Sequence, residues 1–143
     1  KIKFAQLKVF KKGKTEEEAE QELKELNIPE ESVEQVIKFI RINGTTDEKL
    51  QELENLNINN ETYLEGVKEL KDVIKYIRAF RVPEPCFTVD VSIARGLDYY
   101  KNGRGFEISY EGLGSSKQIC GGGQYDGGVG FAFGIDRIIN INQ

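Results

Sequence analysis

Glycine and charge are divided unequally between two halves of the chain, and this division limits the fold more than any other feature of the sequence. Residues 1–85 hold 33 of the 44 charged residues but only 3 of the 15 glycines, whereas residues 86–143 hold 11 charges and 12 glycines. The change falls near Pro83 and Pro85. Glycine disfavours helices and is common in turns. We therefore predict two domains, one over residues 1–85 and the other over residues 86–143.

The first domain is predicted to be helical after an opening strand at residues 2–10. Expected N-caps are Thr15, with Glu18 completing a capping box, Thr46 and Asn60. Apolar residues recur at helical spacing in four stretches: Ala19, Leu23 and Leu26; Val33, Val36, Ile37 and Ile40; Leu50, Leu53 and Leu56; Leu64, Val67, Leu70, Ile74 and Ile77. These stripes predict four amphipathic helices that pack as a small bundle.

The second domain changes to the two-residue period of β-strands. Apolar and polar residues alternate over residues 87–93 and again over 106–110, and residues 118–120 form a short third run. Residues 129–135 are apolar, and Ile138 with Ile141 suggests a helix after them. The predicted class is α+β, with an antiparallel sheet and a helix against it.

Composition excludes several classes of function. The chain has no histidine and only two cysteines, Cys86 and Cys120, so we expect reduced thiols, no bound metal and no Ser/His or Cys/His catalytic device. The net charge of −4 provides no general attraction to nucleic acid. No apolar run is long enough to cross a membrane, and no leader is evident, so we expect a cytoplasmic protein without a membrane partner.

Two arginines beside glycines are the strongest candidates for chemistry. Arg95 ends an apolar stretch and precedes Gly96, where its planar guanidinium suits a phosphate or carboxylate, although a salt bridge to Asp98 or Glu107 is equally compatible with the sequence. Arg137 ends the second glycine-rich run. The chain therefore has candidates for holding a polyphosphate next to a small polar molecule.

A run of three glycines, Gly121-Gly122-Gly123, lies between these arginines in the sequence. It would let a ligand rest directly on the backbone, although a flexible linker is the more usual meaning of such a run. It does not match the phosphate-binding P-loop pattern, which requires a lysine after the glycines.

Four blocks taken together resemble the catalytic core of the histidyl-tRNA synthetase family, in order and in kind. They are Arg95-Gly96-Leu97-Asp98-Tyr99-Tyr100, then Phe106-Glu107, then Cys120-Gly121-Gly122-Gly123-Gln124-Tyr125-Asp126-Gly127, and finally Gly130-Phe131-Ala132-Phe133-Gly134-Ile135-Asp136-Arg137. The first blocks are similar to the two histidine motifs of that family, and the last is similar to motif 3 of class II aminoacyl-tRNA synthetases. Residues 1–85 resemble, more weakly, the helical insertion domain of the family.

The resemblance implies a role for each matched residue. Arg95 is expected to bind the α-phosphate and the histidine carboxylate, and thus to be the catalytic residue. Tyr99, Tyr100 and Tyr125 would border the histidine pocket, with Tyr100 on the imidazole. Gly121, Gly122 and Gly123 would form the backbone surface beneath the substrate. Gly130 would leave room for ATP, Arg137 would hold its γ-phosphate, and Glu107 would orient a neighbour.

The resemblance also implies substrates and partners. These are histidine, ATP with Mg²⁺ and, through a full-length homodimeric enzyme, tRNA(His). Motif 1, motif 2 and the anticodon-binding domain have no counterpart here, so the chain resembles a fragment that would be inactive alone. The loop that usually precedes motif 3 is also short, which suggests that residues are missing between 127 and 129. The alternative is a non-catalytic regulatory subunit of ATP phosphoribosyltransferase, which resembles this family.

Overall fold

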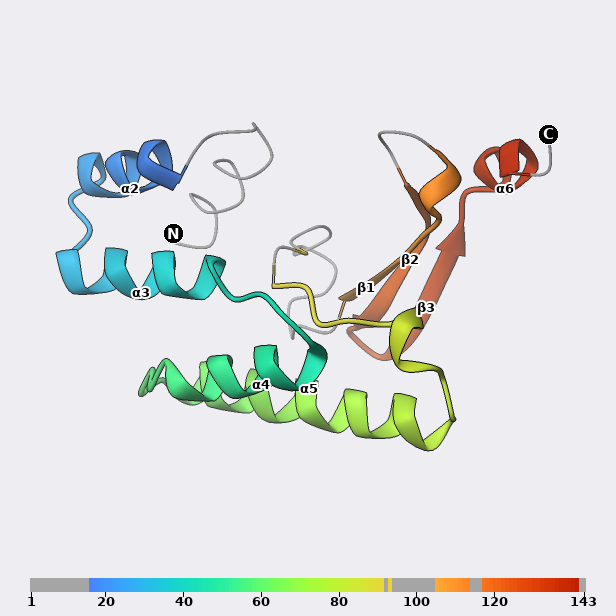
Figure 1. Ribbon diagram of the computed structural model, residues 1–143, viewed down its shortest axis with the longest axis horizontal. Coiled ribbons are helices and arrows are strands. Elements are labelled where there is room, and N and C mark those ends of the chain that lie inside the picture. Colours follow the sequence, from blue (N-terminus) through green and yellow to red (C-terminus); the bar gives the residue numbers. More distant parts are fainter. Residues whose placement is uncertain (1–15, 92, 94–104, 114–116, 142–143) are drawn as a thin grey trace. The chain divides into compact units, whose positions relative to one another are not determined.

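The computed structural model describes residues 16–91, 93, 105–113 and 117–141 of the 143-residue chain. Contacts divide the chain into two compact units, Lys1–Ser92 and Ile93–Gln143 (Figure 1). Among the described residues, the first unit is helical and the second holds a β-sheet followed by a helix. This combination is the α+β class that the sequence predicts. The division follows Ser92, whereas composition changes near Pro85.

The first helix pair consists of α2 (Glu16–Glu25) and α3 (Glu30–Ile40). Their apolar stripes meet in a small cluster of three buried side chains, Leu23, Val33 and Ile37. Between the helices, Asn27 takes a left-handed conformation with φ of 54°, which asparagine tolerates better than most residues. Leu26 is largely exposed, so the stripe of α2 ends before the residue that the periodicity predicted.

The second helix pair consists of α4 (Thr46–Asn55) and α5 (Glu61–Ala79). The predicted cap at Asn60 is confirmed, because its side chain accepts a hydrogen bond from the Tyr63 amide at 3.0 Å. The predicted cap at Thr46 is wrong. Thr45 caps α4 in a capping box with Glu48, and Thr46 is the first helical residue, with its side chain buried.

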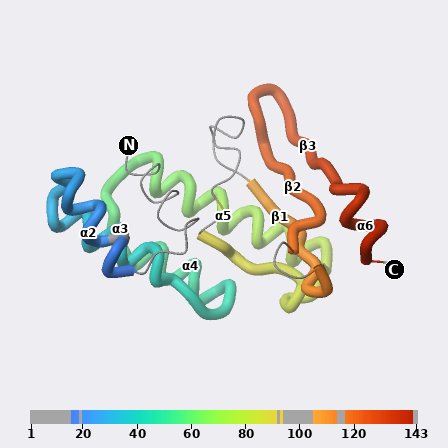
Figure 2. Tube along the Cα trace, turned by 90° about the horizontal axis from the view of Figure 1, so that it is seen from above, coloured from blue at the N-terminus to red at the C-terminus, as the bar shows by residue number. Residues whose placement is uncertain are grey.

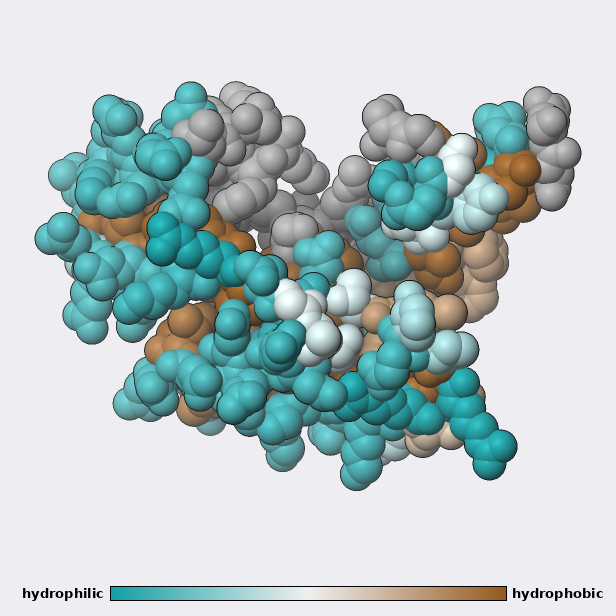
Figure 3. All heavy atoms as spheres, in the orientation of Figure 1, coloured by the Kyte–Doolittle hydropathy of each residue, from teal (hydrophilic) through white to brown (hydrophobic). Residues whose placement is uncertain are grey.

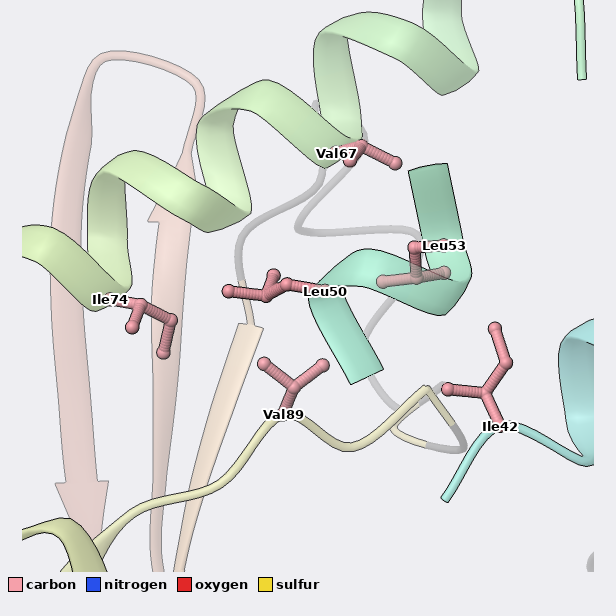
Figure 4. Close-up of a cluster of buried hydrophobic side chains, with 6 residues drawn as sticks. All are labelled: Ile42, Leu50, Leu53, Val67, Ile74 and Val89. Atoms are coloured by element: carbon pink, nitrogen blue, oxygen red, sulfur yellow. The ribbon is translucent and has the colours of Figure 1, made fainter. Parts of the chain in front are cut away.

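Each helix pair has its own buried cluster, and Phe39 of α3 also packs against the larger one. The larger core is drawn in Figure 4 and joins α4 and α5 with two residues outside helices. Its buried members are Ile42, Leu50, Leu53, Val67, Ile74 and Val89. Tyr63 packs against this cluster and donates its hydroxyl to the Leu53 carbonyl at 2.7 Å, whereas Leu64, predicted to lie on the apolar stripe, is mostly exposed.

The strand predicted over residues 87–93 is wrong for the part that the structure describes. After a single 3-10 turn, η1 (Glu84–Cys86), residues 87–90 have no regular secondary structure. The two-residue alternation is nevertheless real, since Val89 is buried and Phe87 and Val91 pack beside it. These side chains pack against the core between α4 and α5. The alternation therefore marks an extended segment with one buried side, and this segment is not a strand of the sheet.

The sheet has three antiparallel strands in the order β1-β2-β3. The strands are β1 (Gly105–Ser109), β2 (Gln118–Tyr125) and β3 (Gly128–Phe133), and η2 (Glu111–Leu113) lies between the first two. The central strand is longer than predicted because it includes all three consecutive glycines. Their position between two hydrogen-bonded neighbours rules out the flexible-linker interpretation for this part of the chain.

A two-residue turn at Asp126 and Gly127 connects β2 to β3. Figure 2 shows these two strands joined at one end as a hairpin. Gly127 has φ of +82°, a conformation that favours glycine. This hairpin lies where the resemblance suggests missing residues, and that suggestion stays a prediction. Immediately after β3, Gly134 donates its amide to Ile119 at 2.9 Å and α6 (Ile135–Ile141) begins, which confirms the predicted helix.

Candidate functional site

The two faces of the three-stranded sheet differ in chemistry. Successive side chains of a strand point to opposite faces, so the register assigns each residue to one of them. Phe106, Gly122 and Phe131 are paired across the strands, and the next row contains Glu107, Gly121 and Ala132 on the other face. We call the first the aromatic face and the second the glycine face.

The aromatic face carries the large side chains of the sheet. Phe131 and Phe133 lie two residues apart on β3 and contact edge to face, with ring centroids 5.6 Å apart. Cys120 is paired with Ile108 and Phe133 and is almost completely buried. Figure 3 shows apolar residues gathered over part of the unit that contains the sheet and α6.

The glycine face is nearly free of side chains on the two rows where the three strands run together. One row consists of Gly105, Gly123 and Gly130, and the other of Glu107, Gly121 and Ala132. Only Glu107 projects a side chain longer than a methyl group from these six positions. Backbone atoms are therefore the main surface that this face can offer to a flat or charged ligand.

Glycine is required for different reasons at neighbouring positions of β2. A methyl group on Gly122 would lie 2.4 Å from the Gly130 carbonyl oxygen and 2.7 Å from Phe131 Cβ, so packing within the sheet excludes it. A methyl group on Gly121 would meet only the end of the flexible Gln118 side chain at 2.7 Å and the Phe106 carbonyl at 3.8 Å. The described structure therefore explains Gly122 but not Gly121 by packing.

Tyr125 is the next side chain of β2 on the glycine face. Its ring extends toward β3, where Cβ atoms added to Gly128 and Gly130 would come within 3.1 Å and 3.3 Å of it. Glycine at these two positions thus makes space for the ring, which is itself about half exposed. Glu107 on β1 and the Tyr125 ring stand on this face, and the end of the Gln118 side chain lies beside Gly121.

Arg137 lies in the first turn of α6. Its amide donates to the Gly134 carbonyl at 3.0 Å, and the stem of its side chain packs close to Gly134 Cα. A half-buried stem on a glycine limits the directions that the guanidinium can take. Arg137 follows Gly130 of the glycine face by seven positions in the sequence. The segment between them consists of the end of β3, Gly134 and the start of α6.

Arg95, Tyr99 and Tyr100 lie outside the described residues, so their predicted roles stay predictions. The structure brings together Gly121, Gly123 and Gly130 on one face with Tyr125, and it turns Gly122 toward the aromatic face. The sequence analysis missed Gly105 and Ala132, which share the glycine face. These two residues are identified only by their pairing with Gly123 and Gly121. The sequence alone could not give that pairing, because it did not show that the glycine run is a strand.

Within residues 16–91, 93, 105–113 and 117–141, no group of three or more histidine, cysteine, aspartate or glutamate side chains is arranged to hold a metal ion. No helix in those same ranges has the length and apolar character needed to cross a membrane. A shallow pocket on the α4–α5 pair is lined by Glu54, Tyr63, Leu64, Val67, Lys68, Lys71 and Asp72, none of which is a predicted site residue.

Proteins whose sequences are similar to this chain are aminoacyl-tRNA synthetases. The sequence model described as histidyl-tRNA synthetase matches residues 5–138, which include both units. The chain belongs to the histidyl-tRNA synthetase family.

Individual relatives agree with this assignment. The chain is 36% identical over 134 residues to the histidine-tRNA ligase of Clostridium tetani, covering 86% of this chain and 30% of that protein. The ligase of Clostridium acetobutylicum is 38% identical over 135 residues, covering 85% of this chain and 31% of the relative. The chain thus spans about a third of the length of these relatives.

A solved structure has a similar fold. The crystal structure of histidyl-tRNA synthetase from Nostoc sp. PCC 7120 superposes with a TM-score of 0.79 at 30% sequence identity. The match covers 98% of this chain and 35% of that one. Nothing in these comparisons favours the regulatory subunit that the sequence left as an alternative.

Proposed function

We propose that this chain is part of the catalytic core of a class II histidine-tRNA ligase. In the proposed reaction, a carboxylate oxygen of histidine attacks the α-phosphorus of ATP and pyrophosphate leaves. A ribose hydroxyl of tRNA(His) then attacks the carbonyl of the resulting adenylate, and AMP leaves. The observation that carries the proposal is the glycine face of β2 and β3 in a member of the histidyl-tRNA synthetase family.

The glycine face suits the binding of histidyl-adenylate. A carboxyl-phosphate centre is polar and crowded, so it can lie close to a strand only where side chains are absent. Gly121 supports this role most directly, because a methyl group there would meet only the movable end of the Gln118 side chain at 2.7 Å and no main chain closer than 3.8 Å. Gly130 extends the same surface and is half-buried, whereas Gly123, on the same face, is buried. Gly122 would support the surface from behind by allowing Phe131 and Phe106 to pack closely.

The charged and aromatic groups have separate proposed roles. Arg95 would bind the histidine carboxylate and the α-phosphate and stabilise the charge that develops during attack. Tyr99, Tyr100 and Tyr125 would border the histidine, with Tyr100 against the imidazole and the Tyr125 ring on the glycine face. Arg137 would hold the γ-phosphate of ATP, supported by the packing of its stem on Gly134.

The remaining partners follow from the proposed reaction. ATP would bind with Mg²⁺, since phosphate oxygens and water are the ligands that this ion prefers, and no metal bound by the protein alone is required. We further propose a cytoplasmic enzyme that works as a homodimer. Both tRNA(His) and the dimer contact would involve parts of the enzyme beyond the third of its length that this chain represents.

Histidine-dependent exchange between ATP and labelled pyrophosphate tests the proposal. It should be measured on the longest natural form of the polypeptide, with each amino acid in turn and with Arg95→Ala. We expect exchange with histidine alone, reduced at least about a hundredfold in the variant because a transition-state contact is lost. A polypeptide that contains motifs 1 and 2 and yet shows no exchange would contradict the proposal.

A further inference from the structure

Gln118 begins β2 at the point where the pairing with β1 is irregular. Ser109 pairs with Gln118 and Ile108 pairs with Cys120, so Ile119 is an extra residue in this register. An insertion of this kind is a β-bulge, which redirects side chains and is common beside active sites. In regular alternation, Gln118 would point to the same face as Cys120, which is the aromatic face.

The end of the Gln118 side chain instead reaches the glycine face. A Cβ built on Gly121 points to that face, and Gln118 Nε2 lies 2.7 Å from it. The same Nε2 donates to the Cys120 carbonyl at 3.4 Å, which is longer than most hydrogen bonds in proteins. Because a bond of this length is weak, a ligand that approaches Gly121 can take over the amide donor at little cost.

A carboxylate stands on the same face as this amide. Glu107 of β1 is paired with Gly121, so its side chain leaves the sheet on the glycine face, and both Glu107 and Gln118 are half-buried. A carboxylate attracts an ammonium group, whereas an uncharged amide can donate to an anionic oxygen. A free amino acid presents both groups together, so the pair beside Gly121 suits the ammonium and carboxylate of an amino acid better than a phosphate alone.

We propose that Gln118 is a further histidine-binding residue, whose side-chain amide donates a hydrogen bond to a carboxylate oxygen of a histidine that lies on Gly121. The inference rests on the proposed function. The oxygen in question is the one that does not attack phosphorus, and it becomes the carbonyl oxygen of the adenylate. Since the contact is then made both before and after the attack, it contributes more to the binding of histidine than to kcat.

Two variants of Gln118 and one matched control test this role. Gln118→Met removes the amide and keeps an unbranched side chain of similar length. Gln118→Glu keeps the shape of the side chain but replaces the donor with a carboxylate, which repels the carboxylate of histidine. The control is Gln124→Met, because Gln124 lies on the same strand, is exposed and shares the aromatic face with Gly122. A general effect of methionine in β2 would appear in both methionine variants.

The experiment uses titration calorimetry on the longest natural form of the polypeptide, with histidine and with histamine, which has the imidazole and amino groups of histidine but no carboxyl group. For Gln118→Met we expect the Kd of histidine to rise at least about tenfold, the usual effect of losing a hydrogen bond to a charged group. The Kd of histamine should stay within about twofold, and kcat for pyrophosphate exchange should change less than the Kd of histidine. Gln118→Glu should weaken histidine further, and Gln124→Met should leave its Kd within about twofold.

Each outcome has a defined meaning. An unchanged Kd of histidine in both Gln118 variants, an equal loss for histamine, or an equal loss in Gln124→Met would overturn the binding role while leaving the ligase proposal intact. Faster amide hydrogen exchange at residues 118–125 in ligand-free Gln118→Met would also overturn it, since the amide would then be holding the bulge. An unaltered polypeptide that neither binds histidine nor shows histidine-dependent exchange would overturn the proposed function and this inference together.

Discussion

The ring of Phe106 lies directly against Gly122, so that a methyl group added to this glycine would be 2.8 Å from Phe106 Cζ. The same methyl group would be 2.4 Å from the Gly130 carbonyl oxygen, which is main chain and cannot rotate away. The consecutive glycines of β2 thus serve two purposes. Gly122 permits close packing on the aromatic face, and Gly121 keeps the opposite face free of a side chain of its own.

Gly122→Ala is expected to destabilise the sheet by roughly 1–3 kcal/mol, the usual cost of forcing an extra carbon into a packed site. The measurement is amide hydrogen exchange at residues 118–133, where protection should fall, with the helical unit as the internal reference. Unchanged protection in β2 and β3 would show that the sheet accommodates the added methyl group without the predicted cost.

Gly121→Ala is expected to keep the sheet and lose activity. The added methyl displaces only the Gln118 side chain, so protection of β2 and β3 should match the unaltered protein. If histidyl-adenylate lies on the glycine face, kcat/KM for pyrophosphate exchange should fall at least about tenfold because the ligand can no longer approach the backbone. Full activity in a folded Gly121→Ala protein would place the substrate elsewhere.

Gly66→Ala is expected to stabilise α5 by about 0.5–1 kcal/mol. Gly66 lies inside this helix, and nothing is within 4 Å of an added Cβ, so alanine brings better helix propensity without a clash. Hydrogen exchange at the α5 amides would measure the gain. Gly44→Ala is the opposing control: φ of +108° and a contact of 2.6 Å with Glu48 Oε2 predict a loss of stability.

Acid should weaken the attachment between Arg78 and Asp47. Hydrogen bonding to the Arg78 guanidinium lowers the pKa of Asp47 below its ordinary value of 3.8. A carboxylate whose pKa is lower in the folded state stabilises the fold fully above 3.8 and loses that contribution as the pH falls through the lower, folded value. The stability of the helical unit should therefore decline below about pH 4.

Arg78→Met tests the cause of this acid sensitivity. The variant should be less stable at neutral pH and should lose part of the decline below pH 4, because Asp47 then titrates near its ordinary value. Chemical denaturation at a series of pH values provides the comparison. An identical pH profile in the two proteins would mean that other carboxylates, such as Glu48 in its capping box, account for the decline.

Local patterns determined much of this structure without help from the rest of the chain. Helical spacing located α2 to α5, because an amphipathic stripe requires no partner to be recognised, and Asn60 was identified as a cap from its chemistry alone. The alternation at residues 106–110 located β1 for the same reason. The order of the glycine and arginine blocks was sufficient for the family.

Tertiary contacts decided what the local patterns left open. Residues 87–91 have the alternation of a strand, but Val89 enters a helical core and Lys49, about forty residues earlier, binds its carbonyl. The glycines at 121–123 could have formed a linker, but pairing with β1 and β3 makes them the centre of a sheet with two different faces. A sequence shows which residues are apolar and which lack a side chain. It does not show which distant segment each of them packs against or pairs with. That is decided only when segments far apart in the sequence come together, because packing and hydrogen bonding act through space.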